Sequence, residues 1–142
     1  QLPASITVET YEVPYEGITI QPLKNGDLVL NCGGDWTFQF HQFPVGQPYQ
    51  LIQQFNEKTQ EKIGLSYLIF EKVAYLQYVV FQLEHAKHQL KFAFNEQVKI
   101  MAVFLDDKAE PLARYEYDIQ GNLIKAIDQN GYTRTYEYNN FH

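Results

Sequence analysis

The chain has 142 residues, a formal net charge of −6 at neutral pH and a single cysteine, Cys32. This length suits one domain with a core of its own, and the negative charge argues against nucleic acid or an anionic membrane surface as partner. One cysteine excludes an internal disulfide framework, and no apolar run of about 18 residues could span a membrane. Eleven Tyr and ten Phe favour β-sheet, because aromatic side chains fit pleated, half-buried surfaces.

The N-terminal part predicts irregular strands. Apolar residues alternate loosely over residues 4–20, and Pro14 interrupts them, which predicts short edge strands or an extended arm. Residues 24–27 form a turn signal between the apolar runs 18–20 and 28–30, so we expect a hairpin here.

The next segment predicts two strands with a restricted loop between them. Glycines at 33–34 precede a strand over 36–40, in which aromatic residues alternate with polar ones. Residues 43–49 contain two prolines and a glycine, which predicts a loop. We expect a strand over 49–55 and a polar turn over 56–62, because the apolar positions do not sustain a helical period.

β-branched and aromatic residues continue through the middle of the chain. They favour strand over helix across residues 63–81. A polar turn is predicted over 83–88, strands over 90–95 and 98–104, and a solvated loop over 106–111.

Residues 112–139 contain the clearest pattern, a repeat. The sequence YEYD at 115–118 returns 21 residues later as YEYN at 136–139. Gly121 supplies the positive φ that closes a short loop, and Asn130–Gly131 predicts a two-residue type I′ hairpin turn. The unit is therefore strand, short loop, strand, tight turn, strand.

Each residue type in the repeat has a physical role. Alternate tyrosines project to one face of a strand and form cross-strand aromatic ladders. Their hydroxyl groups can face water at the edge of such a ladder. Asp118 and Asp128 are expected to cap turn amides through their side chains, which outweighs an acid–base role. The predicted structural residues are Tyr115, Tyr117, Asp118, Gly121, Asn122, Asp128, Gly131, Tyr136 and Tyr138.

Weaker copies precede this repeat. The sequence FAFN at 92–95 stands 23 residues before YEYD, and the strand at 36–40 carries aromatics in the same alternation. We therefore expect one all-β region over residues 1–142. It consists of lead-in strands (1–34), degenerate repeats (35–111) and a clear repeat (112–139).

Over residues 112–139 the pattern YxYDxxGNLIxxxDxxGxxxxYxYN closely resembles the YD repeat of Rhs-family proteins. The resemblance weakens over 90–104 and further over 26–81. It implies an antiparallel meander of hairpins, either one sheet or part of a β-sheet that spirals into a hollow shell. In the family such a shell encloses a C-terminal toxin that bacterial secretion systems deliver. Similar repeats occur in insecticidal toxin complexes and teneurins. The partners implied are the remainder of a longer Rhs-type chain or a toxin cargo.

The chain also departs from the family. A closed shell needs more repeats than 142 residues hold, and the family's cleavage motif, Asp-Pro followed by Gly-Leu, is absent. We expect no toxin domain and no signal peptide within residues 1–142, whose first residues lack a basic region followed by an apolar one. We therefore expect a segment, a short relative or a piece that assembles with others, with edge strands open to self-association.

Metal and cofactor chemistry finds little support in the sequence. His85 and His88 have i,i+3 spacing but fall in a predicted turn, and His41 and His142 are remote, so we expect no metal site. The acidic residues Asp106, Asp107 and Glu110 lack the spacing of a calcium loop. No cofactor fingerprint is present.

Catalytic pairs are equally unsupported. Cys32 lacks the flanking sequence of a nucleophile that would pair with a histidine. Asp27 and Asp35 stand on either side of the glycines at 33–34 and could form a carboxylate pair, but the turn-forming role of aspartate accounts for both. We therefore expect a protein that is not an enzyme. The alternative function is an aromatic-rich β module that binds carbohydrate or protein, and a small toxin or hydrolase domain is a third hypothesis.

Overall fold

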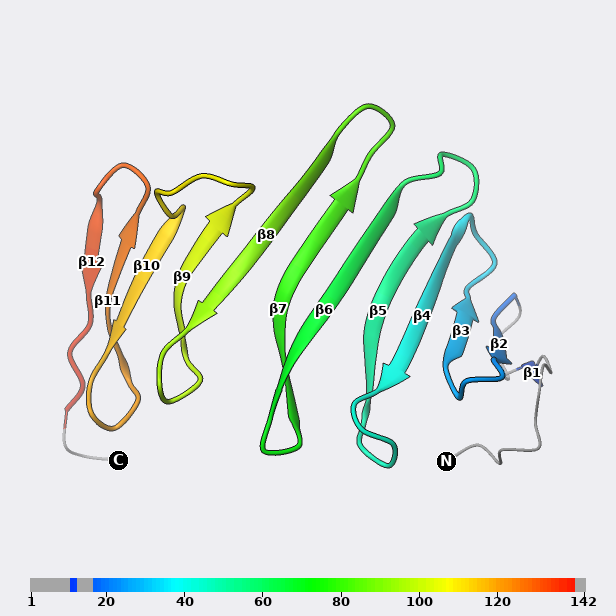
Figure 1. The fold of residues 1–142 in the computed structure, drawn as a ribbon, viewed down its shortest axis with the longest axis horizontal. Helices are drawn as coiled ribbons and strands as arrows, with labels where there is room; N and C mark the ends of the chain where they lie inside the picture. Colours follow the sequence, from blue (N-terminus) through cyan, green and yellow to red (C-terminus); the bar gives the residue numbers. More distant parts are fainter. Residues whose placement is uncertain (1–10, 13–16, 140–142) are drawn as a thin grey trace. The chain divides into compact units, whose positions relative to one another are not determined.

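The computed structural model describes residues 11–12 and 17–139, and every element within them is a β-strand (Figure 1). The expectations for the apolar alternation before residue 11, for Pro14 and for His142 lie outside the described residues. The strands are β1 (Tyr11–Glu12), β2 (Thr19–Pro22), β3 (Leu28–Asn31), β4 (Trp36–Gln42), β5 (Tyr49–Asn56), β6 (Lys62–Phe70), β7 (Val73–Gln82), β8 (Lys87–Phe94), β9 (Ile100–Leu105), β10 (Ala113–Tyr117), β11 (Leu123–Asp128) and β12 (Thr133–Thr135).

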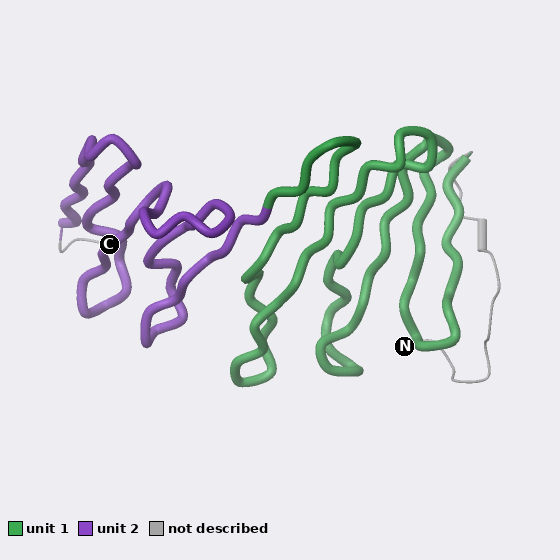
Figure 2. The backbone as a smooth tube through the Cα atoms, turned by 45° about the horizontal axis from the view of Figure 1, so that its top comes forward, with its two compact units in different colours: residues 1–88 green, residues 89–142 purple. Residues whose placement is uncertain are grey.

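The chain divides into two compact units, residues 1–88 and 89–142 (Figure 2). Within each unit the strands pair antiparallel with their neighbours in the chain. The predicted fold class, an all-β antiparallel meander, is therefore confirmed.

Unit 1 confirms the predicted strands of the first half. Strands β2 and β3 form the expected hairpin around Gly26, which has φ +92°. The segments for which a helix was the competing prediction are strands β5, β6 and β7.

The run 63–81 is broken by a turn that the sequence did not indicate. Glu71 and Lys72 have φ +50° and +66° and connect β6 to β7 as a two-residue turn. Glycine and asparagine usually mark such turns. Here the long β6–β7 ladder, running from Lys62 opposite Gln82 to Phe70 opposite Val73, holds two ordinary residues in that conformation.

Three boundaries in the second half were predicted wrongly. The turn predicted over 83–88 ends earlier, because β8 begins at Lys87. The strand predicted from Val98 begins at Ile100, because Val98 lies in a loop with φ +57°. Strand β12 ends at Thr135, so the second copy of the motif, YEYN at 136–139, lies beyond this strand. The Tyr136 amide still donates to the Ile124 carbonyl (2.9 Å).

The type I′ turn predicted at Asn130–Gly131 is also wrong. Such a turn needs positive φ at both residues, and of the two only Gly131 has it, at +84°. The Gly131 amide donates to the Asp128 carbonyl (3.0 Å) and the Asp128 amide donates to the Tyr132 carbonyl (2.9 Å). Three residues, 129–131, therefore connect the closing pair Asp128 and Tyr132, as a type I turn followed by a glycine bulge. The expected pairing of strands on both sides of it, β11 with β12, is confirmed.

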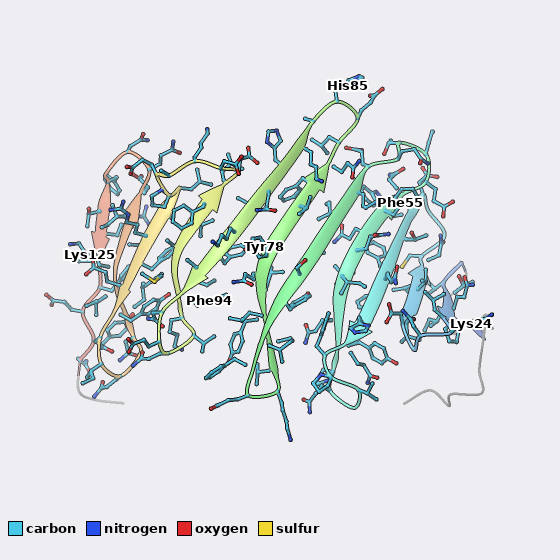
Figure 3. All side chains as sticks on the ribbon, viewed as in Figure 1. Lys24, Phe55, Tyr78, His85, Phe94 and Lys125 are labelled. Atoms are coloured by element: carbon cyan, nitrogen blue, oxygen red, sulfur yellow. The ribbon has the colours of Figure 1, made fainter. Side chains whose placement is uncertain are left out.

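Most side chains in both units are half-buried or exposed. The strands within each unit form a single layer, and side chains project from both of its faces (Figure 3). The buried residues among those described are Pro22, Asp27, Asn56, Val79, Ala102 and Pro111. Ladder hydrogen bonds and cross-strand pairs therefore carry a larger share of stability than a closed core does.

The glycine loop generates a prediction about backbone conformation. A Cβ at Gly131 meets nothing within 4 Å, so Gly131→Ala reports only the cost of positive φ, about 1–2 kcal/mol of unfolding free energy. Gly34 is equally open but has no positive φ. We expect Gly34→Ala to be neutral or stabilising by up to about 1 kcal/mol. Urea unfolding of both variants measures this, and equal destabilisation would contradict it.

Candidate functional site

The repeat centres on a five-residue loop over 118–122. The Asp118 amide donates to the Asn122 carbonyl (2.9 Å), and the Gly121 amide donates to the Asp118 carbonyl (3.0 Å). The Asp118 carboxylate accepts from the amides of Gln120 (3.0 Å) and Asn122 (2.8 Å), and Asn122 Nδ2 donates to its second oxygen (3.2 Å). One carboxylate thus satisfies several donors of the loop.

Two other loops that begin with Asp or Asn repeat this hydrogen-bond pattern, over residues 95–99 and 128–132, and the loop over 23–27, which begins with Leu23, repeats its two backbone bonds. Asn95 and Asp128 occupy the first position, and each side-chain Oδ1 accepts from the third and fifth amides of its loop. The predicted capping by Asp118 and Asp128 is therefore confirmed. The fourth position has positive φ in all three loops: Val98 (+57°), Gly121 (+90°) and Gly131 (+84°).

The loop alters the electrostatics of its first residue. Hydrogen bonds to the carboxylate, the largest from the Asn122 backbone amide, lower the pKa of Asp118 below its ordinary value. Partial burial opposes this shift, and the Asn122 side chain and the amides of Gln120 and Gly121 add to it. These hydrogen bonds thus favour the ionised form of Asp118 as the loop acceptor.

A second recurring feature is a bulge in every other ladder from β4 to β11. The register shifts at Phe40 in β4–β5, at Tyr67 in β6–β7, at Phe94 in β8–β9 and at Tyr117 in β10–β11. An aromatic residue thus stands at each shift. At each shift one residue of the following strand has no partner in the register of that ladder. These residues are, in the same order, Ile52, Gln77, Met101 and Ile124.

Tyrosine hydroxyls donate hydrogen bonds to backbone carbonyls beside the bulge of the preceding hairpin. Tyr117 donates to the Ile100 carbonyl (2.6 Å), and Ile100 lies just before the bulge residue Met101. Tyr138 donates in the same way to Leu123 (2.5 Å), just before Ile124.

The same contact occurs in unit 1, where Tyr67 donates to Leu51 (2.6 Å), just before Ile52. A bulge disrupts the ladder locally, and backbone carbonyls need partners, so each hydroxyl gives the carbonyl beside a bulge a hydrogen-bond donor. Burial raises the pKa of Tyr67 and Tyr117, and in Tyr117 the neighbouring Tyr115 adds to the rise.

The predicted structural residues thus separate into groups. Asp118, Gly121 and Asn122 meet in one loop, and Asp128 and Gly131 in another. Tyr117 and Tyr138 serve as hydroxyl donors, whereas Tyr115 and Tyr136 have no hydroxyl hydrogen bond among the described residues. The bulges and their carbonyls escaped sequence reasoning, and the preference for Tyr over Phe at 67, 117 and 138 was the available signal.

The repeat also leaves two open grooves at equivalent positions in unit 2. One groove, of about 530 Å³, has the bulge residue Met101 and the aromatic Tyr117 in its lining. The other, of about 380 Å³, has Ile124 and Tyr138 in those places. Both include loop residues, Asn95 and Gln97 in the first and Asp118 and Gln120 in the second.

A polar cluster in unit 1 was missed by sequence reasoning. Asp27 is only 2% exposed. Its Oδ1 lies 2.5 Å from His41 Nδ1, and its Oδ2 accepts from Gln39 Nε2 (2.8 Å). The sequence placed Asp27 beside Asp35 and treated His41 as remote. Pairing of β3 with β4, which sets Leu28 opposite Phe40, brings Asp27 to His41.

This cluster has part of the geometry of an acid–base site. A carboxylate at Nδ1 orients an imidazole and leaves Nε2 free to accept a proton. The ring of Phe43 packs edge-on against the His41 ring at 4.4 Å. In the described part of the chain no hydroxyl or thiol is hydrogen-bonded to this imidazole, so the contacts anchor the β2–β3 hairpin to β4.

The remaining candidates stay apart. His85 lies at an exposed loop tip (Figure 3), and its Nε2 is 3.6 Å from Glu84 Oε1. Cys32 is exposed. The Asp106 carboxylate accepts from the Gln89 amide (2.8 Å). No cluster of three or more His, Cys, Asp or Glu among the described residues is arranged to hold a metal ion. Within the same residues, no helix is long and apolar enough to cross a membrane.

The chain matches no protein-family model, and no curated protein matches its sequence.

The hydroxyl contact predicts a matched pair of effects. Tyr117→Phe leaves the Ile100 carbonyl without its donor and should lower the unfolding free energy by about 1 kcal/mol. Tyr115→Phe, on the same strand, removes a hydroxyl without such a bond and should change it by less than about 0.5 kcal/mol. Denaturant unfolding compares the two. Equal costs would show that the hydroxyl at 117 does not support the bulge.

The lowered pKa of Asp118 predicts a pH dependence. A carboxyl with a depressed folded-state pKa contributes stability above its unfolded value, about 4, and loses it as pH falls through the folded value. Asp118→Asn keeps an acceptor in the loop, as Asn95 does naturally. The stability advantage of the unmodified chain over Asp118→Asn should therefore shrink on acidification below about pH 4. Urea titrations over this range measure it, and an advantage that grows in acid would refute the assignment.

Proposed function

We propose that this chain is a non-enzymatic YD-repeat segment of an Rhs-like protein, forming wall material of a shell that encloses or presents a toxin. One observation carries the proposal, namely that a tyrosine that follows a hairpin donates its hydroxyl to a carbonyl beside the bulge of that hairpin, at three of the four bulges. Tyr117 and Tyr138 do this in succession in unit 2.

This contact favours growth of a sheet by repetition. In repeat proteins each unit contacts mainly its neighbours, and stability accumulates from the interfaces between them. A hairpin with tyrosine at this place contributes an aromatic ring and a hydroxyl donor to its predecessor and offers a new bulge carbonyl to its successor. Such a rule suits a long wall better than a closed core.

The exposure of the sheet points in the same direction. Apolar side chains remain open to solvent, including Ile69, Phe70 and Val73 in unit 1 and Met101 in unit 2. Uncovered apolar surface on a single layer suits a sheet that meets further protein, either more repeats or an enclosed cargo. The β12 edge pairs only with β11 among the described residues, and self-association through edges remains a prediction.

The use of the reactive groups supports a structural role. The carboxylates of Asp118 and Asp128 accept loop amides, and the hydroxyls of Tyr67, Tyr117 and Tyr138 are held by carbonyls. Groups committed to the backbone in this way are poorly placed to act on a substrate.

The decisive experiment is to recover the complete open reading frame and determine the structure of its product by electron cryomicroscopy. We expect further hairpins with the same loop, bulge and tyrosine contact, and an enclosed domain that resists added protease while the shell is intact. A frame without further copies, whose product is monomeric and binds no other chain, would overturn the proposal.

A glycan- or protein-binding β module remains the alternative, and the repeated grooves beside Tyr117 and Tyr138 favour it. A glycan array with the isolated chain separates the two functions. Tyr136 is 38% exposed and lines one of the grooves. Binding that is lost in Tyr136→Ala would favour the binding module over the wall.

A further inference from the structure

Among the three five-residue loops that begin with Asp or Asn, the loop over 128–132 differs chemically from the other two at its third and fourth positions. These positions hold Gln97–Val98 and Gln120–Gly121 in the other loops, and Asn130–Gly131 here. The asparagine side chain is one methylene shorter than glutamine, so its amide carbon reaches the next backbone nitrogen in a five-membered ring. Glycine leaves that nitrogen unhindered.

The surroundings of Asn130 leave this reaction open. Asn130 is exposed, and its side-chain amide has no hydrogen bond among the described residues. The Gly131 amide is held by one bond to the Asp128 carbonyl (3.0 Å). The adjoining strand β12 has three residues, all of them exposed. Segments with few buried contacts open locally at low free energy, which frees the Gly131 nitrogen.

The second Asn–Gly pair of the chain, Asn25–Gly26, is held more firmly. The Asn25 Oδ1 accepts from the Asp27 amide (2.9 Å). Asp27 itself is buried and bonded through both carboxylate oxygens to His41 and Gln39. Opening this turn requires breaking those contacts, so the same dipeptide is protected here.

We propose that Asn130 is a site of spontaneous modification, converted selectively to aspartate and isoaspartate in the folded protein. The Gly131 nitrogen bonds to the Asn130 side-chain carbon and gives up its proton to solvent, and the side-chain nitrogen leaves as ammonia. Water then opens the resulting cyclic imide at either of its two carbonyl carbons and restores the Gly131 N–H. Asparagine is among the residues that are least stable chemically.

The products change the hairpin in defined ways. While the imide exists, Gly131 has no N–H to donate to the Asp128 carbonyl. Isoaspartate adds one methylene to the backbone of a loop closed by the bond from the Asp128 amide to Tyr132. Either product places a carboxylate close to that of Asp128. We expect the β11–β12 hairpin to loosen.

The test is peptide mapping by mass spectrometry after incubation of the whole chain at mildly alkaline pH, both native and in urea. In the native chain conversion at Asn130 should be at least about tenfold faster than at Asn25, because the two turns differ in the free energy of local opening. In urea the two rates should converge.

Asn130→Gln, the residue type at this position of the equivalent loops, should abolish conversion at 130 and leave conversion at Asn25 unchanged. Two results would overturn the proposal. One is a native chain that converts Asn25 as fast as Asn130 or faster. The other is an Asn130 to Asn25 rate ratio that is the same in native buffer and in urea.

Discussion

Bulges recur in the hairpins of this chain, and at three of them a tyrosine hydroxyl donates to the carbonyl just before the residue that the register shift leaves without a partner. The ladder shifts at Phe40, Tyr67, Phe94 and Tyr117, and a shift disturbs cross-strand pairing. Where the next hairpin supplies a tyrosine, its hydroxyl bonds to the carbonyl before the bulge, as at Ile100 and Leu123. A phenylalanine at that place packs in the same way but donates nothing. Tyrosine therefore couples one hairpin to the next.

The loops solve a related problem at the ends of the strands. A five-residue loop leaves amides that no strand can pair, and an Asp or Asn at its first position accepts two of them. Because an amide oxygen can accept the same two amides, Asn95 fills in its own loop the place that Asp118 fills in the other. This explains why the copy at 92–95 lacks aspartate but keeps the loop. The fourth position needs positive φ, which Gly121 adopts freely and Val98 adopts against its preference.

The two units satisfy buried polar groups by different means. In unit 2 the repeated contacts are local to neighbouring hairpins. In unit 1 the buried Asp27 links the β2–β3 hairpin to β4 through Gln39 and His41, a contact that no other hairpin of the described chain repeats. The wall proposed for the Rhs-like protein thus joins a specially anchored lead-in to regular hairpins.

The sequence by itself determined the all-β class, the strand order, and the capping roles of Asp118 and Asp128, because aromatic alternation and turn residues are local signals. The tertiary structure decided the turn at Glu71–Lys72, the true form of the loop at Asn130–Gly131, the end of β12 at Thr135 and the contact of Asp27 with His41. These depend on ladder register, and register sets which residues face each other across strands that lie many positions apart in the chain. The 21-residue repeat indicated that tyrosine mattered, but only the fold identified the carbonyl to which its hydroxyl bonds.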